Sequence, residues 1–442
     1  KISSYNPTQV VLVCLAWTRS SSLPRDFLLH MEVIDDVHPP QGGSRSRSRS
    51  RSKSNSLPRS RLRIVEFFAG MGGMRSAADV SGLSFEVVAA YEISEICAKA
   101  YQHNFGSDEW FVKTIDSLSA EDLDKLEADV WLMSPPCQPF TRSGRQKDTE
   151  DNRTMALLNL VKVLGEMKRR PRFLLLENVI GFEQSGSRSQ LISALAGLGW
   201  VCAEFALHPE DFGLPNRRPR YYGLFREHHP QSEVADRWCK WTPAKELADA
   251  QSGNKGAAPA LQGVPWKASL PAPLGDFLQS PADLEAEEKL LGESLEIPQK
   301  VMEKRLERDS RCDVHIRSDH SSGCFTKVNG RLPRGHSPLV VIDEAETGPL
   351  EERQRVSADG RDPIIDHVWQ PGVRLRYISP VEQLRLMGYP AAYSFPPDLT
   401  FKDIASLVGN SLNVKVVAWL LRVLLGGEGL IEAPEMLGER RH

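Results

Sequence analysis

Four short apolar runs, separated by segments long enough for helices, constrain the fold of this chain more than any other feature. They lie between Leu62 and Val179 and read LRIVEFF, EVVAAYE, DVWLMS and RFLLLENV. Continuous apolar runs are typical of parallel strands that are covered on both faces, and the segments between them can hold crossover helices. The pattern therefore predicts an α/β fold with a doubly wound, mostly parallel sheet.

The regular pattern has limits within the 442 residues. Residues 1–58 include a Ser/Arg repeat, which is predicted to be disordered because it cannot bury apolar surface. Regular structure covers 59–226, gives way to a stretch rich in Gly, Ala and Pro within 227–372, returns over 373–426 and ends before a tail at 427–442. We expect a large α/β domain, a smaller irregular domain and a C-terminal return to the first.

Charge and cysteine content limit the partners and the compartment. Ser44 to Arg63 holds eight Lys or Arg and no acid, and removing these charges from the formal net charge of −3 leaves −11. A nucleic-acid partner would therefore need a local basic patch. The seven cysteines form no C-x-x-C pair, so no disulfide framework and no metal site is predicted, and a reducing compartment, cytoplasm or nucleus, is expected. The apolar run Val10 to Trp17 is too short to span a membrane.

A glycine-rich turn follows the first predicted strand. Gly70, Gly72 and Gly73 lie between strand and helix, where they permit a tight turn and let a ligand approach the first N–H groups of the helix. Glu92 ends the next strand, where an acid can bind ribose hydroxyls. Because the full G-x-G-x-x-G spacing is missing, the two features indicate an adenosine-containing cofactor rather than a dinucleotide. A turn without a ligand is the alternative.

Cys137 lies just past the carboxyl end of the third apolar run, in the sequence SPPCQPF. Open α/β sheets bind their ligands at this position. Three prolines stiffen the loop, and Arg142 and Arg145 follow closely, which favours an accessible and reactive thiol. A buried structural cysteine is the alternative.

Two further predicted strands carry charged residues. Glu177 follows four apolar residues, so we expect it to be partly desolvated and able to hold a proton near neutrality. A loop carboxylate that caps the next helix is the alternative. Arg218 and Arg220 are predicted to alternate on a strand and to point to one face, where they could hold a phosphate or a carbonyl oxygen. Without the other motifs they would be a solvated cationic edge.

Together these motifs resemble the cytosine-C5 methyltransferase family. In chain order they are FAGMGG, YE, SPPCQPF, LLLENV, NRRPR and GNSLN, and they cover roughly residues 62 to 424. The resemblance implies the S-adenosylmethionine-dependent methyltransferase fold, with a smaller, irregular target-recognition domain over 227–372. The sequence around Cys137 and the tripeptide Cys324-Phe325-Thr326 are similar to the branch that methylates cytosine 38 in the anticodon loop of aspartate tRNA.

The resemblance also implies the catalytic roles. Cys137 would attack carbon 6 of the cytosine, and Glu177 would donate a proton to N3. Arg218 and Arg220 would hold O2 and the backbone near the thiolate. The activated ring would then take the methyl group of S-adenosylmethionine at carbon 5. Because a stacked base hides this atom, the base must be extruded.

The cofactor site implied by the family draws on both ends of the matched region. The glycine turn would hold the methionine end, Glu92 the ribose, and an apolar and acidic frame the adenine, with Ser134 near the transferred methyl group. The implied cofactor-binding residues are Phe68, Gly70, Met71, Gly72, Gly73, Glu92, Ile93, Ile115, Asp116, Ser134, Asn410 and Ser411.

The target is less constrained than the reaction. The branch usually has an aromatic-glycine pair where this chain has Asn329-Gly330, so a stacking side chain is expected to be missing from the RNA-facing loop. tRNA is the leading target, bound by a monomer through a cradle that includes Arg142, Arg145, Arg217 and Lys327. DNA methylation by the same chemistry and a catalytically silent RNA-binding protein are the alternatives. The intact catalytic residues argue against the silent protein.

Overall fold

The computed structural model describes residues 61–107, 110–111, 114–136, 152–227, 241–242, 270–306, 313–327, 338–344, 348–355 and 364–425. Several predictions concern residues outside these ranges. They are the N-terminal Ser/Arg extension, Cys137, Arg142, Arg145, the Asn329-Gly330 pair and the C-terminal tail.

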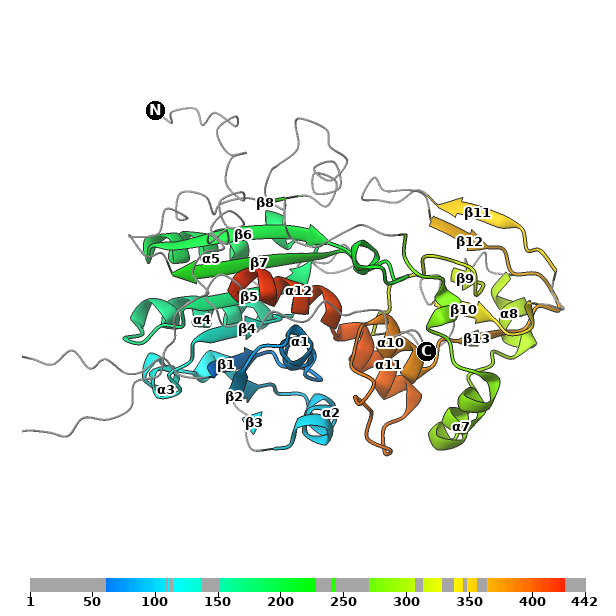
Figure 1. The fold of residues 1–442 in the computed structure, drawn as a ribbon, viewed down its shortest axis with the longest axis horizontal. Coiled ribbons are helices and arrows are strands. Elements are labelled where there is room, and N and C mark those ends of the chain that lie inside the picture. Colours follow the sequence, from blue (N-terminus) through cyan, green and yellow to red (C-terminus); the bar gives the residue numbers. More distant parts are fainter. Residues whose placement is uncertain are drawn as a thin grey trace, which may run out of the picture.

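An eight-stranded sheet forms the larger part of the molecule, in the order β3-β2-β1-β4-β5-β7-β6-β8 (Figure 1). Strands β1, β2, β4 and β5 are mutually parallel, and β7 runs antiparallel between β5 and β6. The predicted doubly wound, mostly parallel sheet is confirmed. The strands are β1 Leu62–Phe67, β2 Phe85–Tyr91, β3 Trp110–Phe111, β4 Val130–Met133, β5 Phe173–Val179, β6 Trp200–Leu207, β7 Arg220–Glu227 and β8 Trp241–Thr242.

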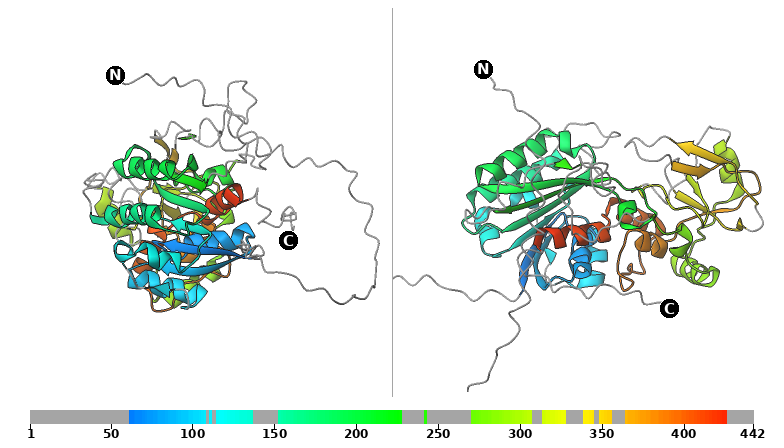
Figure 2. Two further views of the ribbon diagram at one scale, coloured as in Figure 1. Left: turned by 90° about the vertical axis from the view of Figure 1, so that its left-hand side faces the viewer. Right: turned by 45° about the horizontal axis from the view of Figure 1, so that its top comes forward.

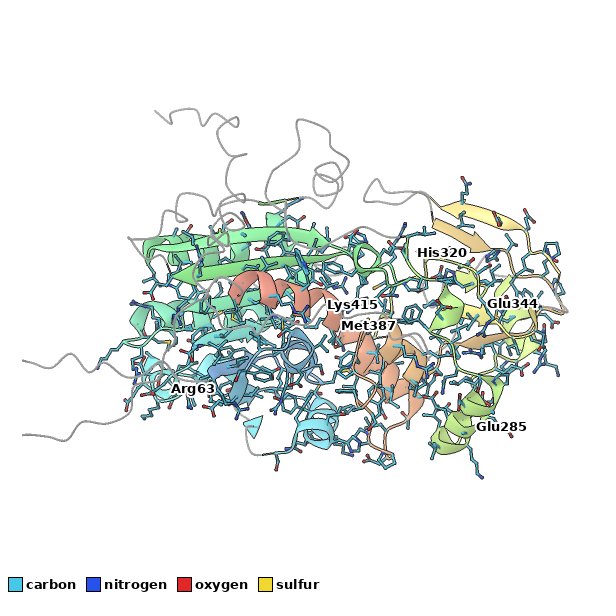
Figure 3. The ribbon with its side chains drawn as sticks, viewed as in Figure 1. Arg63, Glu285, His320, Glu344, Met387 and Lys415 are labelled. Carbon is cyan, nitrogen blue, oxygen red and sulfur yellow. The ribbon has the colours of Figure 1, made fainter. Side chains whose placement is uncertain are left out.

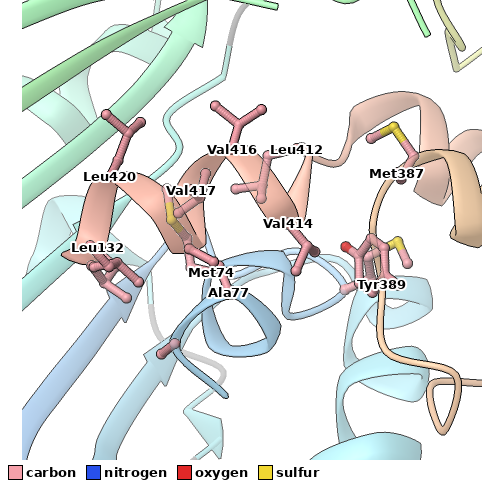
Figure 4. Close-up of a cluster of buried hydrophobic side chains, with 14 of the residues drawn as sticks. Met74, Ala77, Leu132, Met387, Tyr389, Leu412, Val414, Val416, Val417 and Leu420 are labelled. Carbon is pink, nitrogen blue, oxygen red and sulfur yellow. The ribbon is translucent and has the colours of Figure 1, made fainter. Parts of the chain in front are cut away.

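Helices cover both faces of this sheet, which explains why its strands are continuous apolar runs. Ile64 packs into a core that contains residues of α1 and α12, whereas the next residue, Val65, packs into a second core with residues of α4 and α5. Figure 4 shows Met74 and Ala77 of α1 beside α12. The helices are α1 Gly73–Ser81, α2 Glu95–Phe105, α3 Ala120–Asp124, α4 Asn152–Glu166, α5 Gly186–Gly197, α7 Pro281–Leu291, α8 Gln299–Leu306, α10 Pro380–Leu386, α11 Phe401–Asn410 and α12 Val414–Leu425, with short 3-10 turns at Ile115–Ser117, Phe182–Gln184, Pro209–Phe212 and Leu274–Asp276.

A second, five-stranded sheet has its own core and lies at one end of the first (Figure 2). Its order is β11-β12-β9-β10-β13, and α10 and α11 lie between the two sheets (Figure 1). The strands are β9 Asp313–His315, β10 Pro338–Val341, β11 Glu352–Arg355, β12 Ile364–His367 and β13 Leu375–Tyr377.

The two sheets exchange segments at positions that differ from the predicted limits. β8 joins the large sheet by pairing with β6, although it follows residue 226. β13 joins the small sheet by pairing with β10, although it follows residue 372. Both strands are too short to leave a periodic pattern in the sequence, because two or three residues cannot show alternation.

The C-terminal part of the region 373–426 ends in two helices, α11 and α12. The chain breaks between α11 and α12, where the Asn413 side chain accepts a hydrogen bond from Val416 N at 3.2 Å, as a helix cap does. Val414 N donates to Met387 O at 2.9 Å, and Met387 and Lys415 lie close together near the junction of the sheets (Figure 3). The stretch Phe401–Leu425 is long and apolar enough to cross a membrane, but 67% of its most apolar window is buried inside the protein.

Candidate active site

A cavity of about 520 Å³ lies at the carboxyl ends of β1, β2, β4 and β5. This is where the strand order reverses and where open α/β sheets bind ligands. Of the described residues predicted for the site, all but Gly72 line this cavity. They are Phe68, Gly70, Met71, Gly73, Glu92, Ile93, Ile115, Asp116, Ser134, Glu177, Arg218, Arg220, Asn410 and Ser411.

The turn after β1 has a conformation that requires glycine. Gly70 and Gly72 have φ values of 55° and 86°, and Phe68 also has a positive φ of 58°. A Cβ atom on Gly72 would lie 2.3 Å from the Phe105 ring. Gly72 precedes α1 and provides no side-chain cap, and Gly73 and Met74 at the start of the helix line the cavity, where helix N–H groups favour an anionic ligand.

Glu92 joins the two loops that form this side of the cavity. Its carboxylate accepts hydrogen bonds from the backbone N–H groups of Gly70 at 3.1 Å, Ile93 at 2.8 Å and Ser94 at 3.1 Å. Glu92 therefore holds the glycine turn against the end of β2, in addition to any contact with a ligand. The sequence pattern predicted this acid at a strand end, but it gave no indication of these backbone hydrogen bonds.

Glu177 is the centre of a polar cluster on the opposite side. Ser134 Oγ donates to Glu177 Oε2 at 2.6 Å, and Arg220 Nε lies 3.3 Å from Glu177 Oε1. Pro135 and Pro136, the residues that precede Cys137, also line the cavity. Of the described residues predicted for catalysis, Glu177 and Arg220 thus lie together, with Ser134 beside them.

Arg218 does not lie on the strand where it was predicted. β7 begins at Arg220, so Arg218 precedes the strand, and it is only 2% exposed. Its guanidinium donates to the carbonyl oxygens of Phe325 at 2.9 Å, of Gly409 at 3.2 Å and of Ser411. Burial lowers the pKa of Arg218 from its ordinary value, and the nearby Arg220 adds to this. Two arginines that alternate in sequence therefore have different surroundings.

One residue of the predicted RNA-binding cradle, Arg217, also differs from its prediction. Arg217 Nε lies 3.3 Å from Glu210 Oε2 and its side chain is largely buried, so Arg217 is part of an internal ion pair. Lys327 is exposed, as the prediction requires. Phe325 of the Cys324-Phe325-Thr326 tripeptide is 1% exposed, so this side chain belongs to the core.

Two tyrosines that the sequence analysis missed support the cofactor side of the cavity. Tyr393 OH donates to Met71 O at 2.6 Å, and Tyr389 OH lies 2.6 Å from Ser411 Oγ. Both come from the segment after α10. For Tyr393 the sequence carried no signal of this role, because its contact joins residues 322 positions apart.

Residues 62–425 match the C-5 cytosine-specific DNA methylase family. The chain belongs to the cytosine-C5 methyltransferase family. It is 30% identical to the human tRNA (cytosine(38)-C(5))-methyltransferase, with 82% of this chain and 99% of the relative covered. It is 31% identical to a DNA (cytosine-5)-methyltransferase of Dictyostelium discoideum, with 83% and 94% covered.

Solved structures agree with this assignment. The Schizosaccharomyces pombe Dnmt2 methyltransferase has a TM-score of 0.61 at 26% identity, with 83% of this chain and 98% of that chain covered. A Spodoptera frugiperda DNMT2 mutant has a TM-score of 0.63 at 27% identity, with 82% and 99% covered. As a member of this family, the chain of 442 residues uses S-adenosylmethionine as its methyl donor and modifies carbon 5 of cytosine.

The cavity of the methyltransferase fits that cofactor. The start of α1, where Gly73 and Met74 line the cavity, suits the carboxylate of the methionine moiety, and Glu92 suits ribose hydroxyls. Ile93, which is 68% exposed at the rim, and Ile115 offer apolar surface to an adenine ring. When bound, the cofactor supplies an electrophilic methyl group.

Proposed function

We propose that this methyltransferase acts on tRNA and modifies cytosine 38 in the anticodon loop of aspartate tRNA. The observation that carries the proposal is the extent of the similarity to the tRNA (cytosine(38)-C(5))-methyltransferases. The matches cover 99% of the human relative and 98% of the S. pombe relative, at 30% and 31% identity. The relatives are therefore matched over almost their whole length.

The catalytic residues have separate tasks in this proposal. Cys137 attacks carbon 6 of the cytosine and makes carbon 5 nucleophilic. Glu177 gives a proton to N3, and Ser134, 2.6 Å from its Oε2, fixes the carboxyl group. Arg220, 3.3 Å from Glu177, is near enough to bind O2 of the same ring. Carbon 5 would take the methyl group that the cofactor supplies, and loss of the proton from carbon 5 to a base would then break the bond from carbon 6 to sulfur and release the Cys137 thiolate.

The smaller sheet and its helices are the proposed target-recognition domain. In the chain they come after Glu177, Arg218 and Arg220 and before Asn410 and Ser411. Residues that line the cavity therefore lie on both sides of them in the sequence. Lys327 is an exposed cation at the end of the segment that packs beside Arg218. An anticodon loop presents unstacked bases, so extruding one costs less than the few kcal/mol typical of a paired base. We propose that the protein works in the cytoplasm or the nucleus, where tRNA occurs.

DNA is the second candidate target. The Dictyostelium relative, 31% identical over 378 residues, is described as a DNA (cytosine-5)-methyltransferase. A chain with a formal charge of −11 outside its Ser/Arg tract has little to gain from a long duplex phosphate array, which favours tRNA.

A competition experiment tests the target. The full chain is given labelled S-adenosylmethionine with equimolar aspartate tRNA, other tRNAs and duplex DNA, and the methylated position is mapped by bisulfite sequencing. We expect aspartate tRNA to be methylated fastest, at cytosine 38, because its loop presents the base unpaired. Aspartate tRNA with uridine at position 38 is the matched control and should accept no methyl group.

Faster methylation of duplex DNA than of any tRNA would reject the tRNA proposal and support the second candidate. The assignment to the cytosine-C5 methyltransferase family would stand in either case.

A further inference from the structure

The buried Arg218 guanidinium binds two segments that are far from Arg218 and from each other in the sequence. Its Nη1 donates to Phe325 O at 2.9 Å and lies 3.4 Å from Cys324 Sγ. Its Nη2 donates to Gly409 O at 3.2 Å and to Ser411 O. These acceptors are mainly backbone carbonyls, so the contacts hold main chain rather than side chains.

One of these segments, Ser321–Lys327, is fastened to the loop before β7 along its length. Arg217 N donates to Ser322 O at 2.9 Å, Asn216 Nδ2 donates to Gly323 O at 2.8 Å, and Ser322 Oγ donates to Pro215 O at 2.6 Å. None of the residues Ser321–Lys327 lines the cofactor cavity. The segment is therefore connected to the cavity through its neighbours.

The other segment, Gly409–Ser411, forms part of the cavity wall. It packs directly on the first, because a Cβ atom on Gly409 would lie 2.1 Å from Thr326 C and 2.3 Å from Lys327 N. Arg218 holds the two backbones at this close approach. A cofactor that orders the backbone of Gly409–Ser411 must therefore also affect the backbone motion of Ser321–Lys327.

We propose that Arg218 is a positioning residue that couples the cofactor cavity to the Ser321–Lys327 segment of the smaller domain. Two of its three nitrogen atoms are already used by main-chain carbonyls and a sulfur atom, which leaves Nε as its one nitrogen without a hydrogen-bond partner among the described residues. Arg220, 3.3 Å from Glu177, is the arginine beside the proposed catalytic carboxylate. The coupling concerns the cofactor alone, so it does not depend on whether tRNA or DNA is the target.

Amide hydrogen exchange on the wild-type chain tests the coupling without any substitution. S-adenosylhomocysteine, the product form of the cofactor, is added at saturation and no nucleic acid is present. We expect slower exchange across Ser321–Lys327, although these residues are outside the cavity, and no change in α7, which is also part of the smaller domain. Unchanged exchange in Ser321–Lys327 would overturn the proposal.

The variant Arg218→Lys tests the residue itself. A lysine ammonium keeps the charge but cannot reach three carbonyls with a planar fork. We expect its affinity for S-adenosylhomocysteine, measured by calorimetry without nucleic acid, to fall roughly tenfold, the size of one lost charge-assisted hydrogen bond.

The matched control is Arg376→Lys. Arg376 is 6% exposed and forms two bonds with Glu382, at 2.7 and 2.8 Å, but it does not line the cavity. Arg376→Lys should lower thermal stability. Its affinity for S-adenosylhomocysteine should stay within about twofold of wild type, because distant sites act independently. A role of Arg218 in holding the base alone predicts unchanged affinity in Arg218→Lys, and that result would overturn the proposal. If Arg218→Lys does not fold, the exchange experiment decides.

Discussion

At the scale of single residues, the same residue type has different tasks depending on which atoms it can reach. Arg220 reaches the carboxylate of Glu177 in the cavity, whereas Arg218 reaches main-chain carbonyls behind it. The sequence pattern predicted both arginines near the site. It could not separate their roles, because the partners of Arg218 lie more than 100 residues away in the chain.

Gly409 offers a direct test of the close approach between the two segments. In Gly409→Ala, the new Cβ atom would meet Thr326 C at 2.1 Å, and backbone atoms cannot rotate away as a side chain can. We expect the free energy of unfolding, from urea denaturation, to fall by about 1–3 kcal/mol.

Gly165→Ala in α4 is the control for that substitution, because nothing lies within 4 Å of its added Cβ atom. Alanine is the better helix former, so the free energy of unfolding of Gly165→Ala should rise by about 0.5–1 kcal/mol. Equal stability of Gly409→Ala and wild type would show that the segments are not packed as described.

At the scale of helices and strands, a charged cluster ties the small sheet together. His315 on β9 is fully buried, with Nδ1 3.1 Å from Asp319 Oδ2 and Nε2 3.3 Å from Asp313 Oδ1. His367 Nε2 on β12 lies 3.0 Å from Asp319 Oδ1. Burial alone would lower the pKa of His315, but Asp313 and Asp319 raise it to about 9. Burial would raise the pKa of Asp319, but the two histidines lower it to about 2.

This cluster predicts how stability depends on pH. The folded pKa of His315 lies above its ordinary value of 6.5, so the protonated ring stabilises the fold below pH 6.5 and this contribution is lost as the pH rises to about 9. We expect the free energy of unfolding to fall by roughly 2–3 kcal/mol across that range. Urea denaturation in a pH series measures it.

The variant His315→Gln should be less stable at pH 6.5 and should show a flatter profile between pH 7 and 9. Burial raises the pKa of Glu66 to about 7, so its own loss of stability with rising pH lies mainly below pH 7, and the two profiles are therefore compared above that pH. A His315→Gln profile as steep as that of wild type would contradict the assigned protonation.

The same scale shows how far the sequence predicts the fold. The four apolar runs predicted β1, β2, β4 and β5, because strands buried on both faces leave a continuous signal. β8 and β13 have two and three residues and left none. The apolar residues continue across the break between α11, which ends at Asn410, and α12, which Asn413 caps, so the apolar pattern alone does not reveal it.

At the scale of the whole molecule, the site is built from the two ends of the matched region. β1 and β2 supply the cofactor turns, and Asn410 and Ser411 complete the same cavity after the chain has formed the small sheet. The order of motifs predicted this arrangement through the family resemblance. Residue chemistry alone could not, because nothing in GNSLN indicates which distant turn it contacts.

The central claim is that this chain methylates carbon 5 of cytosine with Cys137 as the nucleophile, and a covalent trap tests it most directly. Aspartate tRNA and duplex DNA, each carrying 5-fluorocytosine, are incubated separately with the full chain and S-adenosylmethionine. Fluorine at carbon 5 prevents the final proton loss, so the enzyme stays attached to the base.

We expect a denaturant-stable complex with the wild-type chain, resolved by gel electrophoresis, and peptide mass spectrometry should place the base on Cys137. The variant Cys137→Ala should form none while still binding S-adenosylhomocysteine, because its cofactor residues are unchanged. A complex that persists in Cys137→Ala, or the absence of any complex between the wild-type chain and either nucleic acid, would contradict the claim.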